Sequence, residues 1–500
     1  MSSLLKSSFL VSILTLVSIA ISFLNQVMIA ASFGTGHEMD TYLLLTSFPF
    51  LISGVISSAF SFSLIPHFVT KSFNYFLQFI KICIVITLVL FVFFILVYHF
   101  FVIDYFNLRS FPNIEILNVI VWLVFLFTIP FSIISCYFTS KARFIIPVVL
   151  NFFPFIFSIL CILIFDEIGV NAIIFGLLLG YLFSIFFSIY MLKNEKRDLT
   201  NVSTASEVFD FLKSMKYSVF SMLTFSVFQV VDAYWGSKLG ESSISYLGYS
   251  QRIIIALGAL VIAGPSSVLI PRLTESYKSG DLKAYYYDTS MIIKLVFALT
   301  SYAVLICSFF SRDIVIIMFQ RGNFNEASTQ NVAELLPLML IGMVFMLSVV
   351  ISFRSIFIQP INYKTGIVGI LTFLIYFILS GIFSTYFNVK GIAVAYILTW
   401  IFIFCITIKM LYKTEVKAFF VDFVRFLSKQ ISVLVLIFGL VFVLELLFNG
   451  ADLGLLGKLL KLSAFGLISL LIYLFISIRI LKMKELIFLM SKIPYINRWI

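Results

Sequence analysis

The sequence predicts an all-α integral membrane protein with about fourteen transmembrane helices. Hydrophobic residues make up 62% of the 500-residue chain and charged residues only 11%, which is far outside the range of soluble domains. Apolar runs of roughly 20 residues, the length that crosses a bilayer, recur along the whole chain. The runs that we interpret as spans are 9–33, 41–65, 79–103, 114–138, 142–165, 168–192, 215–237, 244–270, 289–310, 330–353, 363–385, 390–411, 430–449 and 455–478.

The first run, 9–33, is too long for the core of a signal peptide and lacks a small-residue cleavage site, so we expect it to remain as a helix. The connections between the predicted spans are short. The longest polar ones are 193–216, 272–288 and 409–429, and none of them has room for a catalytic domain. Since no Ser/His/Asp arrangement, Walker loop or GxGxxG motif is visible, we expect a transporter without its own ATPase and not an enzyme.

The basic residues predict the orientation of the chain. With the N-terminus in the cytoplasm, the non-cytoplasmic loops hold only Arg109, Lys238, Arg312, Arg321, Lys390, Lys458 and Lys461. Arg252 lies inside a span, and the other 26 of the 34 Lys and Arg residues fall on the cytoplasmic side. This bias follows the positive-inside rule and predicts that both termini are cytoplasmic. The bias also explains the net charge of +11, because basic residues hold the loops on the cytoplasmic side next to the anionic inner leaflet. No nucleic-acid partner is therefore expected.

The chain also repeats itself. The stretch "SFSLIPHFVTKS" closes the second span and "SSVLIPRLTESY" closes the eighth, with Leu64 and Leu269 separated by 205 positions. Because this offset covers an even number of helices, the two halves run parallel, related by an axis along the membrane normal. We therefore expect a six-helix lobe at 1–197, a second six-helix lobe at 198–414, and two additional transmembrane helices within 415–500.

Polar side chains gather in equivalent helices of the two halves. They are Asn25 and Gln26 in the first span, Ser53 and Ser57 in the second, Gln229 and Asp232 in the seventh, and Arg252 in the eighth. A charge at membrane depth costs at least ~2.5 kcal/mol, so such a residue needs a cavity or a partner. One interpretation is structural: the serines permit close helix packing, and Arg252 pairs with Asp232 or reaches the interface. The functional interpretation is a polar lumen, in which Arg252 binds an anion in bidentate fashion and Asp232 is a titratable or cation-binding group.

No metal site or cofactor is expected. The cysteines all lie inside apolar runs without CxxC spacing, and they are Cys83, Cys136, Cys161, Cys307 and Cys405. The three histidines, His37, His67 and His99, lie at the ends of spans and are too scattered to share a metal ion.

Several stretches, taken in order, resemble one known family. They are "FGTGHEMDTYLLLTSFPFLISGVISSAFSFSLIPHF" in the first helix pair, "YSQRIIIALGALVIAGPSSVLIPRL" in the eighth span, "IVIIMFQRGNF" before the tenth span and "FIQPINYKTGIVGIL" between the tenth and eleventh spans. Over nearly the whole chain the sequence resembles the MurJ/MviN lipid II flippases. That family belongs to the multidrug/oligosaccharidyl-lipid/polysaccharide exporter (MOP) superfamily, together with the MATE transporters and the Wzx-type polysaccharide flippases.

The resemblance implies a MATE-like fold in the bacterial cytoplasmic membrane and a flippase that works by alternating access. Its substrate would be an undecaprenyl-pyrophosphate-linked saccharide, either lipid II for the peptidoglycan cell wall or a surface-polysaccharide repeat unit. The saccharide would move from the inner to the outer leaflet. Membrane lipids would be further partners, and the two additional C-terminal helices would form a groove for the lipid tail.

The resemblance also implies roles for single residues. Arg252 matches the family's arginine in the eighth helix, and Asp40 matches the acidic residue expected at an outer gate. The family's other cavity arginines correspond here to Ile19 and Asn25 in the first span and to Ser53 and Gly54 in the second. Most of the cationic cavity is therefore absent, and the pyrophosphate would be met by Arg252 together with Asn25, Gln26 and the serines of the second span.

Two other functions stay open at this point. A cation-coupled multidrug antiporter of the same superfamily would use Asp232 as its coupling carboxylate, but a small drug has no need of a lipid-tail groove. A membrane-embedded polysaccharide polymerase would need reacting groups in an outer loop, and the outer loops 104–113 and 311–329 are short and lack an acid/base pair. The sequence does not choose the glycan, the coupling ion or the oligomeric state.

Overall fold

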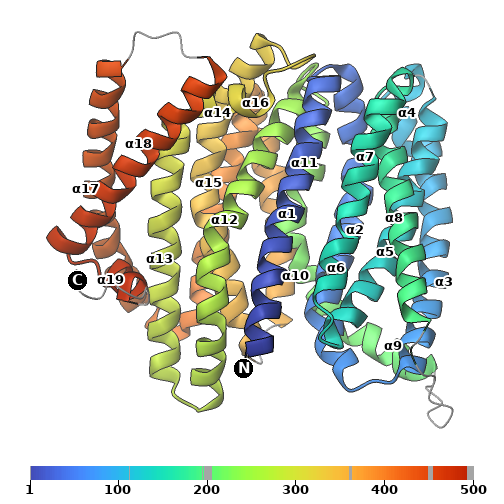
Figure 1. Ribbon diagram of the computed structural model, residues 1–500, viewed down its shortest axis with the longest axis horizontal. Coiled ribbons are helices and arrows are strands. Elements are labelled where there is room, and N and C mark those ends of the chain that lie inside the picture. Colours follow the sequence, from blue (N-terminus) through green and yellow to red (C-terminus); the bar gives the residue numbers. More distant parts are fainter. Residues whose placement is uncertain are drawn as a thin grey trace. The chain divides into compact units, whose positions relative to one another are not determined.

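The computed structural model describes residues 2–111, 113–193, 195, 205–359, 363–448 and 454–491, and no strand occurs in these ranges. The helices are α1 (Ser2–Phe33), α2 (His37–Val69), α3 (Phe73–Val97), α4 (Ile103–Tyr105), α5 (Ile114–Ser140), α6 (Ile145–Leu150), α7 (Phe152–Ile164), α8 (Asn171–Leu192), α9 (Ala205–Ser214), α10 (Lys216–Ser226), α11 (Phe228–Gly236), α12 (Ser243–Lys278), α13 (Leu282–Phe309), α14 (Ser311–Phe319), α15 (Glu326–Ile358), α16 (Tyr363–Tyr412), α17 (Val416–Phe448), α18 (Leu455–Phe475) and α19 (Lys484–Ser491) (Figure 1). Short π or 3-10 turns occupy Tyr98–Val102, Leu108–Ser110, Asp166–Ile168, Lys413–Glu415 and Ile476–Ile480.

The described part of the chain contains 12 helices that are long and apolar enough to cross a membrane, so this is a multi-pass membrane protein. One of them, α16, has 50 residues, which is about 75 Å of helix against a hydrocarbon core of about 30 Å. Its backbone leaves helical geometry at Asn388 (φ 50°, ψ −136°), so α16 contains both predicted spans, 363–385 and 390–411. The predicted span 215–237 is divided into α10 and α11, each too short to be counted alone. The expectation of an all-α membrane protein with about fourteen passes is confirmed at this level.

The helix ends differ from the prediction. Much of the polar connections 272–288 and 409–429 is helical, because α12, α13 and α17 continue beyond their apolar runs. The connection 193–216 contains α9, and the predicted outer loop 311–329 contains α14. Hydropathy detects only the part of a helix that lies in hydrocarbon, so it misses polar end turns that stay helical outside it.

Contacts between Cα atoms divide the chain into two compact units. Unit 1 comprises Met1–Gly248, Arg321–Ser328 and Tyr363–Ser384, and unit 2 comprises Tyr249–Gln320, Thr329–Asn362 and Thr385–Ile500. The predicted lobe boundary at 197/198 lies outside the described residues, and the boundary at 414/415 falls in the short turn between α16 and α17. The division into lobes therefore stays a prediction.

Within unit 1, α2 packs against α5, α10 and α11, while α5 also contacts α3 and α8. Aromatic pairs join α3 to α5. The ring of Phe94 stacks on Trp122 with 4.9 Å between centroids, and Phe76 stacks on Tyr137 at 4.2 Å. These large apolar rings fill the space between helices whose backbones are already satisfied by their own hydrogen bonds.

The helix that the sequence did not predict, α9, lies against α3. Its Phe211 ring stacks on His67 of α2 with 3.9 Å between centroids. Its Glu207 carboxylate lies 3.3 Å from Lys71 Nζ, just after the end of α2. Part of the polar connection 193–216 is therefore an amphipathic helix, α9, which packs against α3 and against the end of α2.

Within unit 2, polar contacts hold α17 against α13. Lys294 of α13, whose side chain is 6% exposed, forms an ion pair with Asp422 of α17, whose side chain is 64% exposed. Two turns further along, the side-chain amide of Gln430 donates to Ser301 Oγ (2.8 Å) and accepts from the hydroxyl of Tyr473 in α18 (3.1 Å). In apolar surroundings an unpaired polar group costs free energy, so these contacts favour one register of α17 and α18 on α13.

We expect Asp422→Asn to lower the free energy of unfolding by about 1–3 kcal/mol, because it leaves the buried Lys294 ammonium without its carboxylate. The exposed position of Asp422 keeps this below the cost for a fully buried pair. Lys294→Met combined with Asp422→Asn should recover most of the loss. Denaturant unfolding in detergent measures the free energy of unfolding of the wild type, the single variants and the double variant. The control is Asp210→Asn on the exposed face of α9. A double variant no more stable than Asp422→Asn alone would contradict the pairing.

Candidate functional site

The turn between α1 and α2 is where segments that are far apart in the sequence meet within unit 1. Asn323 donates from its backbone N–H and from its side-chain amide to carbonyl groups at the end of α1, at 2.8 and 2.5 Å. The hydroxyl groups of Thr35 and Ser328 lie 2.7 Å apart, and the carbonyl of Thr35 accepts a hydrogen bond from Ser242. The turn is thereby tied to the residues before α12 and at the start of α15.

Two glycines permit this close approach. Gly34 and Gly322 both have positive φ, 58° and 55°. A Cβ at Gly34 would collide with the carbonyl of Asn323, and a Cβ at Gly322 would collide with the carbonyl of Ala31. Any other residue at either position would be strained in its backbone and would push the two segments apart.

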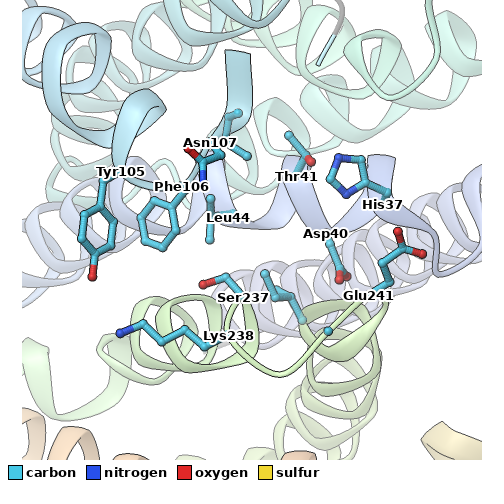
Figure 2. Close-up of a pocket in the computed structure, with 13 residues that line it drawn as sticks. His37, Asp40, Thr41, Leu44, Tyr105, Phe106, Asn107, Ser237, Lys238 and Glu241 are labelled. Atoms are coloured by element: carbon cyan, nitrogen blue, oxygen red, sulfur yellow. The ribbon is translucent and has the colours of Figure 1, made fainter. Parts of the chain in front are cut away.

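Asp40 adds a charged contact to the same end of the unit. Its buried carboxylate accepts hydrogen bonds from the backbone N–H of Ser245 (2.8 Å) and from the Ser245 hydroxyl. Ser245 lies in the first turn of α12, where backbone N–H groups have no partner within the helix. Asp40 therefore caps α12 from α2 and lies at the positive end of the α12 dipole (Figure 2). We call the contacts made by Thr35, Asp40, Ser242, Ser245, Asn323 and Ser328 the turn latch.

Asn25 and Gln26 of α1 are placed differently from the residues of the latch. Asn25 is buried and Gln26 is half-buried. Neither Asn25 Oδ1 nor Gln26 Oε1 has a hydrogen-bond partner among the described residues, although both atoms are buried. Buried polar atoms are nearly always paired in folded proteins, so these two oxygens are available to water or to a ligand.

Ser53 and Ser57 lie one turn apart on α2. The Ser53 hydroxyl donates to the carbonyl of Phe50 (3.2 Å), and the Ser57 hydroxyl lies 2.7 Å from that of Ser132 on α5. The contact of Ser57 fits the helix-packing interpretation, because a small side chain allows α2 and α5 to approach and bond.

Gln229 and Asp232 lie on α11, the former half-buried and the latter buried. The Asp232 carboxylate accepts a hydrogen bond from the hydroxyl of Tyr376 on α16. The Tyr376 ring packs at 4.6 Å between centroids against Phe228, on the same short helix as Asp232. The sequence-based pairing of Asp232 with Arg252 involves the other unit and stays a prediction.

Arg252 lies on α12 in unit 2 and is half-buried. Its guanidinium carbon is 5.0 Å from the ring centroid of Tyr249, one turn earlier on the same helix. Its buried Nη1 has no hydrogen-bond partner among the described residues. A guanidinium that lies on an aromatic face and has an unpaired Nη1 is suited to binding a phosphate.

Unit 2 also contains an apolar cavity of about 470 Å³ between α13, α15 and α17. Its lining includes Phe297, Phe309, Ile341, Phe345, Leu434 and Phe438. The resemblance placed a lipid-tail groove on the two C-terminal helices. In the described part of the chain this cavity uses α17, but its other walls come from α13 and α15.

A family model described as lipid II flippase MurJ matches residues 29–465. The chain belongs to the MurJ family. It is 25% identical to the probable lipid II flippase MurJ of Buchnera aphidicola subsp. Schizaphis graminum, over 97% of this chain and 99% of the relative. It is 27% identical to the probable lipid II flippase MurJ of Aquifex aeolicus, over 40% of this chain and 39% of the relative.

Solved structures agree on the fold. The chain is similar to a lipid II flippase MurJ in an inward closed conformation, with a TM-score of 0.77, 20% identity, and coverage of 95% of this chain and 99% of that one. It is also similar to an inward-facing multidrug resistance MATE family transporter of the MOP superfamily, with a TM-score of 0.63, 13% identity and coverage of 81% and 98%. The predicted MurJ resemblance and MATE-like fold are confirmed.

Among the residues of this MurJ family member that the structure places in polar contacts, sequence reasoning missed Tyr376, Ser245, Asn323 and Lys294. The sequence does not indicate the roles of Tyr376 and Ser245, because a tyrosine or serine within an apolar run carries no information about the residue it will bond to. Asn323 lay in a motif noted for its resemblance alone. Lys294 lies inside the predicted span 289–310, so the cost of a charge at membrane depth indicates a partner for it as it does for Arg252.

The turn latch predicts a cross-link. We expect Thr35→Cys with Ser328→Cys to form a disulfide under mild oxidation, because the two native hydroxyl oxygens lie 2.7 Å apart. A mobility shift on a non-reducing gel measures it. The matched control is Thr35→Cys with Ser140→Cys, since Ser140 ends α5 beside the far end of the 33-residue α2. Equal cross-linking of both pairs would contradict the latch geometry.

Proposed function

We propose that this protein is a flippase that moves an undecaprenyl-pyrophosphate-linked saccharide from the inner to the outer leaflet of the bacterial cytoplasmic membrane. The observation that carries the proposal is the MurJ family match over residues 29–465, since it spans most of the transmembrane helices. The MATE-like fold supports it, because this fold is built for alternating access and needs no catalytic residue. Both termini lie in the cytoplasm, as the distribution of basic residues predicts.

The substrate's pyrophosphate binds Arg252, and neutral groups accept hydrogen bonds from the saccharide. Support comes from the unpartnered Nη1 of Arg252 and from the unpartnered side-chain oxygens of Asn25 and Gln26. Of the other residues predicted for substrate binding, Gln229 is half-buried, whereas the hydroxyls of Ser53 and Ser57 already bond to the carbonyl of Phe50 and to Ser132. Because the oxygens of Asn25 and Gln26 accept hydrogen bonds, they suit the hydroxyl or amide groups of a saccharide better than a phosphate.

The turn latch is the outer gate, and Asp40 is its charged member. The latch is closed in this structure, with α2 tied to α12 through the contacts of Asp40 and Ser245. Opening separates the α1–α2 turn from the starts of α12 and α15. The cross-link between Thr35→Cys and Ser328→Cys would then stop transport, and a reductant would restore it. The lobes 1–197 and 198–414 rock against each other, and the helices of 415–500 accompany the second lobe.

The first test depletes the resident lipid II flippase of a bacterial host and expresses this protein in its place. Growth and outer-leaflet lipid II are expected to be restored, and lipid II is measured by its accessibility to an external enzyme or probe. Failure of a protein that is folded in the membrane would contradict lipid II as the substrate. The same assay with surface-polysaccharide repeat units would then decide whether any lipid-linked saccharide is moved.

In the same assay we expect Arg252→Ala to lower the transport rate by about tenfold to a hundredfold, because a lost charge-assisted hydrogen bond is worth about 1.5–3 kcal/mol. Arg252→Lys keeps the charge without the bidentate fork, and an intermediate rate is expected. Membrane abundance and melting temperature are the controls for folding. An unchanged rate for Arg252→Ala would contradict the head-group role.

Asp232 is the coupling group of this transporter. Its buried carboxylate, bonded to Tyr376, supports the proposal because a carboxylate at this depth needs a proton, a cation or a donor. We expect Asp232→Asn to remove the dependence of transport on pH, sodium or membrane potential, whereas Tyr376→Phe should keep it. Transport into vesicles with imposed gradients measures both variants. An unaltered dependence in Asp232→Asn would contradict the coupling role.

A further inference from the structure

A cavity of about 640 Å³ in unit 1 belongs neither to the polar residues of the helix interior nor to the apolar cavity of unit 2. Three segments line it: the first two turns of α2, residues 105–108 after α3, and the connection between α11 and α12 (Figure 2). Its volume lies in the range of pockets that hold small molecules. The cavity adjoins Asp40, so it lies directly beside the turn latch.

One side of this cavity is aromatic. Tyr105 and Phe106 lie together at one end of it (Figure 2). The Tyr105 side chain is 60% exposed, yet its position is set by Tyr234, whose ring is nearly parallel to it at 6.4 Å and whose hydroxyl lies 3.2 Å from its own. Lys238 fixes Tyr234 in turn, with its ammonium 4.2 Å from the ring centroid and 2.8 Å from the hydroxyl. The aromatic surface is therefore held in place before any ligand arrives.

The other side of the cavity is polar and of mixed character. His37 and Glu241 lie opposite the aromatic pair, and Asn107 and Ser237 lie between them (Figure 2). These side chains offer both donors and acceptors. A site for a free phosphate would instead gather several cations, whereas here Glu241 and Asp40 balance Lys238.

Thr41 gives an independent indication of a ligand. It lines the same cavity and is 2% exposed. Its Oγ1 is buried and has no hydrogen-bond partner among the described residues. A hydroxyl left unpaired in a buried position is costly, and a polar molecule in the cavity would satisfy it.

We propose that this cavity binds a pyranose ring of the transported saccharide at the outer face of the gate. A pyranose has an apolar C–H face, which lies well on an aromatic ring, and a rim of hydroxyl groups that both donate and accept. The cavity offers a matching pair of surfaces, with Tyr105 and Phe106 on one side and the polar side chains on the other. This inference rests on the proposed function, because the saccharide would pass the cavity when the turn latch opens.

The test uses the full-length protein in lipid nanodiscs and N,N′-diacetylchitobiose as a soluble, lipid-free probe. Saturation-transfer NMR and calorimetry should give saturable binding with a Kd on the order of 1 mM. Tyr105→Ala should weaken binding by about tenfold, and Tyr105→Phe, which keeps the ring, should leave it nearly unchanged. The matched control is Phe101→Ala, because Phe101 is a highly exposed aromatic residue nearby that is not among the residues lining the cavity.

Three results would overturn the inference. The wild-type protein could show no saturable binding up to tens of millimolar. Binding could weaken equally in Tyr105→Ala and Phe101→Ala, which would make these rings interfacial anchors only. Inorganic pyrophosphate could displace the sugar, which would make the cavity an anion site. The lipid II assay is read separately. A protein that flips lipid II without binding the probe refutes this inference alone, and one that binds the probe without flipping lipid II refutes lipid II as the substrate.

Discussion

The cost of a polar side chain at membrane depth organises this structure. A group of this kind must find a partner on another helix or remain open to a ligand. Lys294 has Asp422, and Asp232 has Tyr376. The side-chain oxygens of Asn25 and Gln26 and one nitrogen of Arg252 have no such partner in the described part of the chain. The paired groups fix helices against each other, and the unpaired ones are those to which we assign substrate binding.

Hydropathy was sufficient to predict the fold class, because the bilayer allows only helices or closed barrels and apolar runs reveal the helices. It was insufficient for the ends of the helices. Lys278 and Val416 were assigned to loops but lie in α12 and α17. The helices α9 and α14 were not predicted, because their apolar residues cover only one face or too few turns. The two apolar runs within α16 predict separate spans, and the helix is broken between them at Asn388.

The candidate site was predictable only in part, since a sequence shows which polar residues lie in the membrane but not which residues they meet. Asp40 and Ser245 are separated by 205 positions, and Asp232 and Tyr376 by 144. No local pattern connects such pairs. The structure also divides the polar residues that the sequence grouped together: Ser57 bonds to Ser132 in helix packing, whereas Asn25 leaves its oxygen unused.

The turn latch has a strength that suits an alternating gate. It consists of separate hydrogen bonds, each worth about 1 kcal/mol net, with a larger contribution from the carboxylate of Asp40. Together they amount to several kcal/mol, which is comparable to the roughly 5.5 kcal/mol that moves a two-state equilibrium from 1:99 to 99:1. A substrate can supply such a difference only through contacts that change between states. Of the cavity arginines that the resemblance implies, only Arg252 is present here, so in the proposed mechanism fewer of those contacts involve the pyrophosphate. The saccharide must then contribute more, and a sugar site beside the latch would let it favour the open gate.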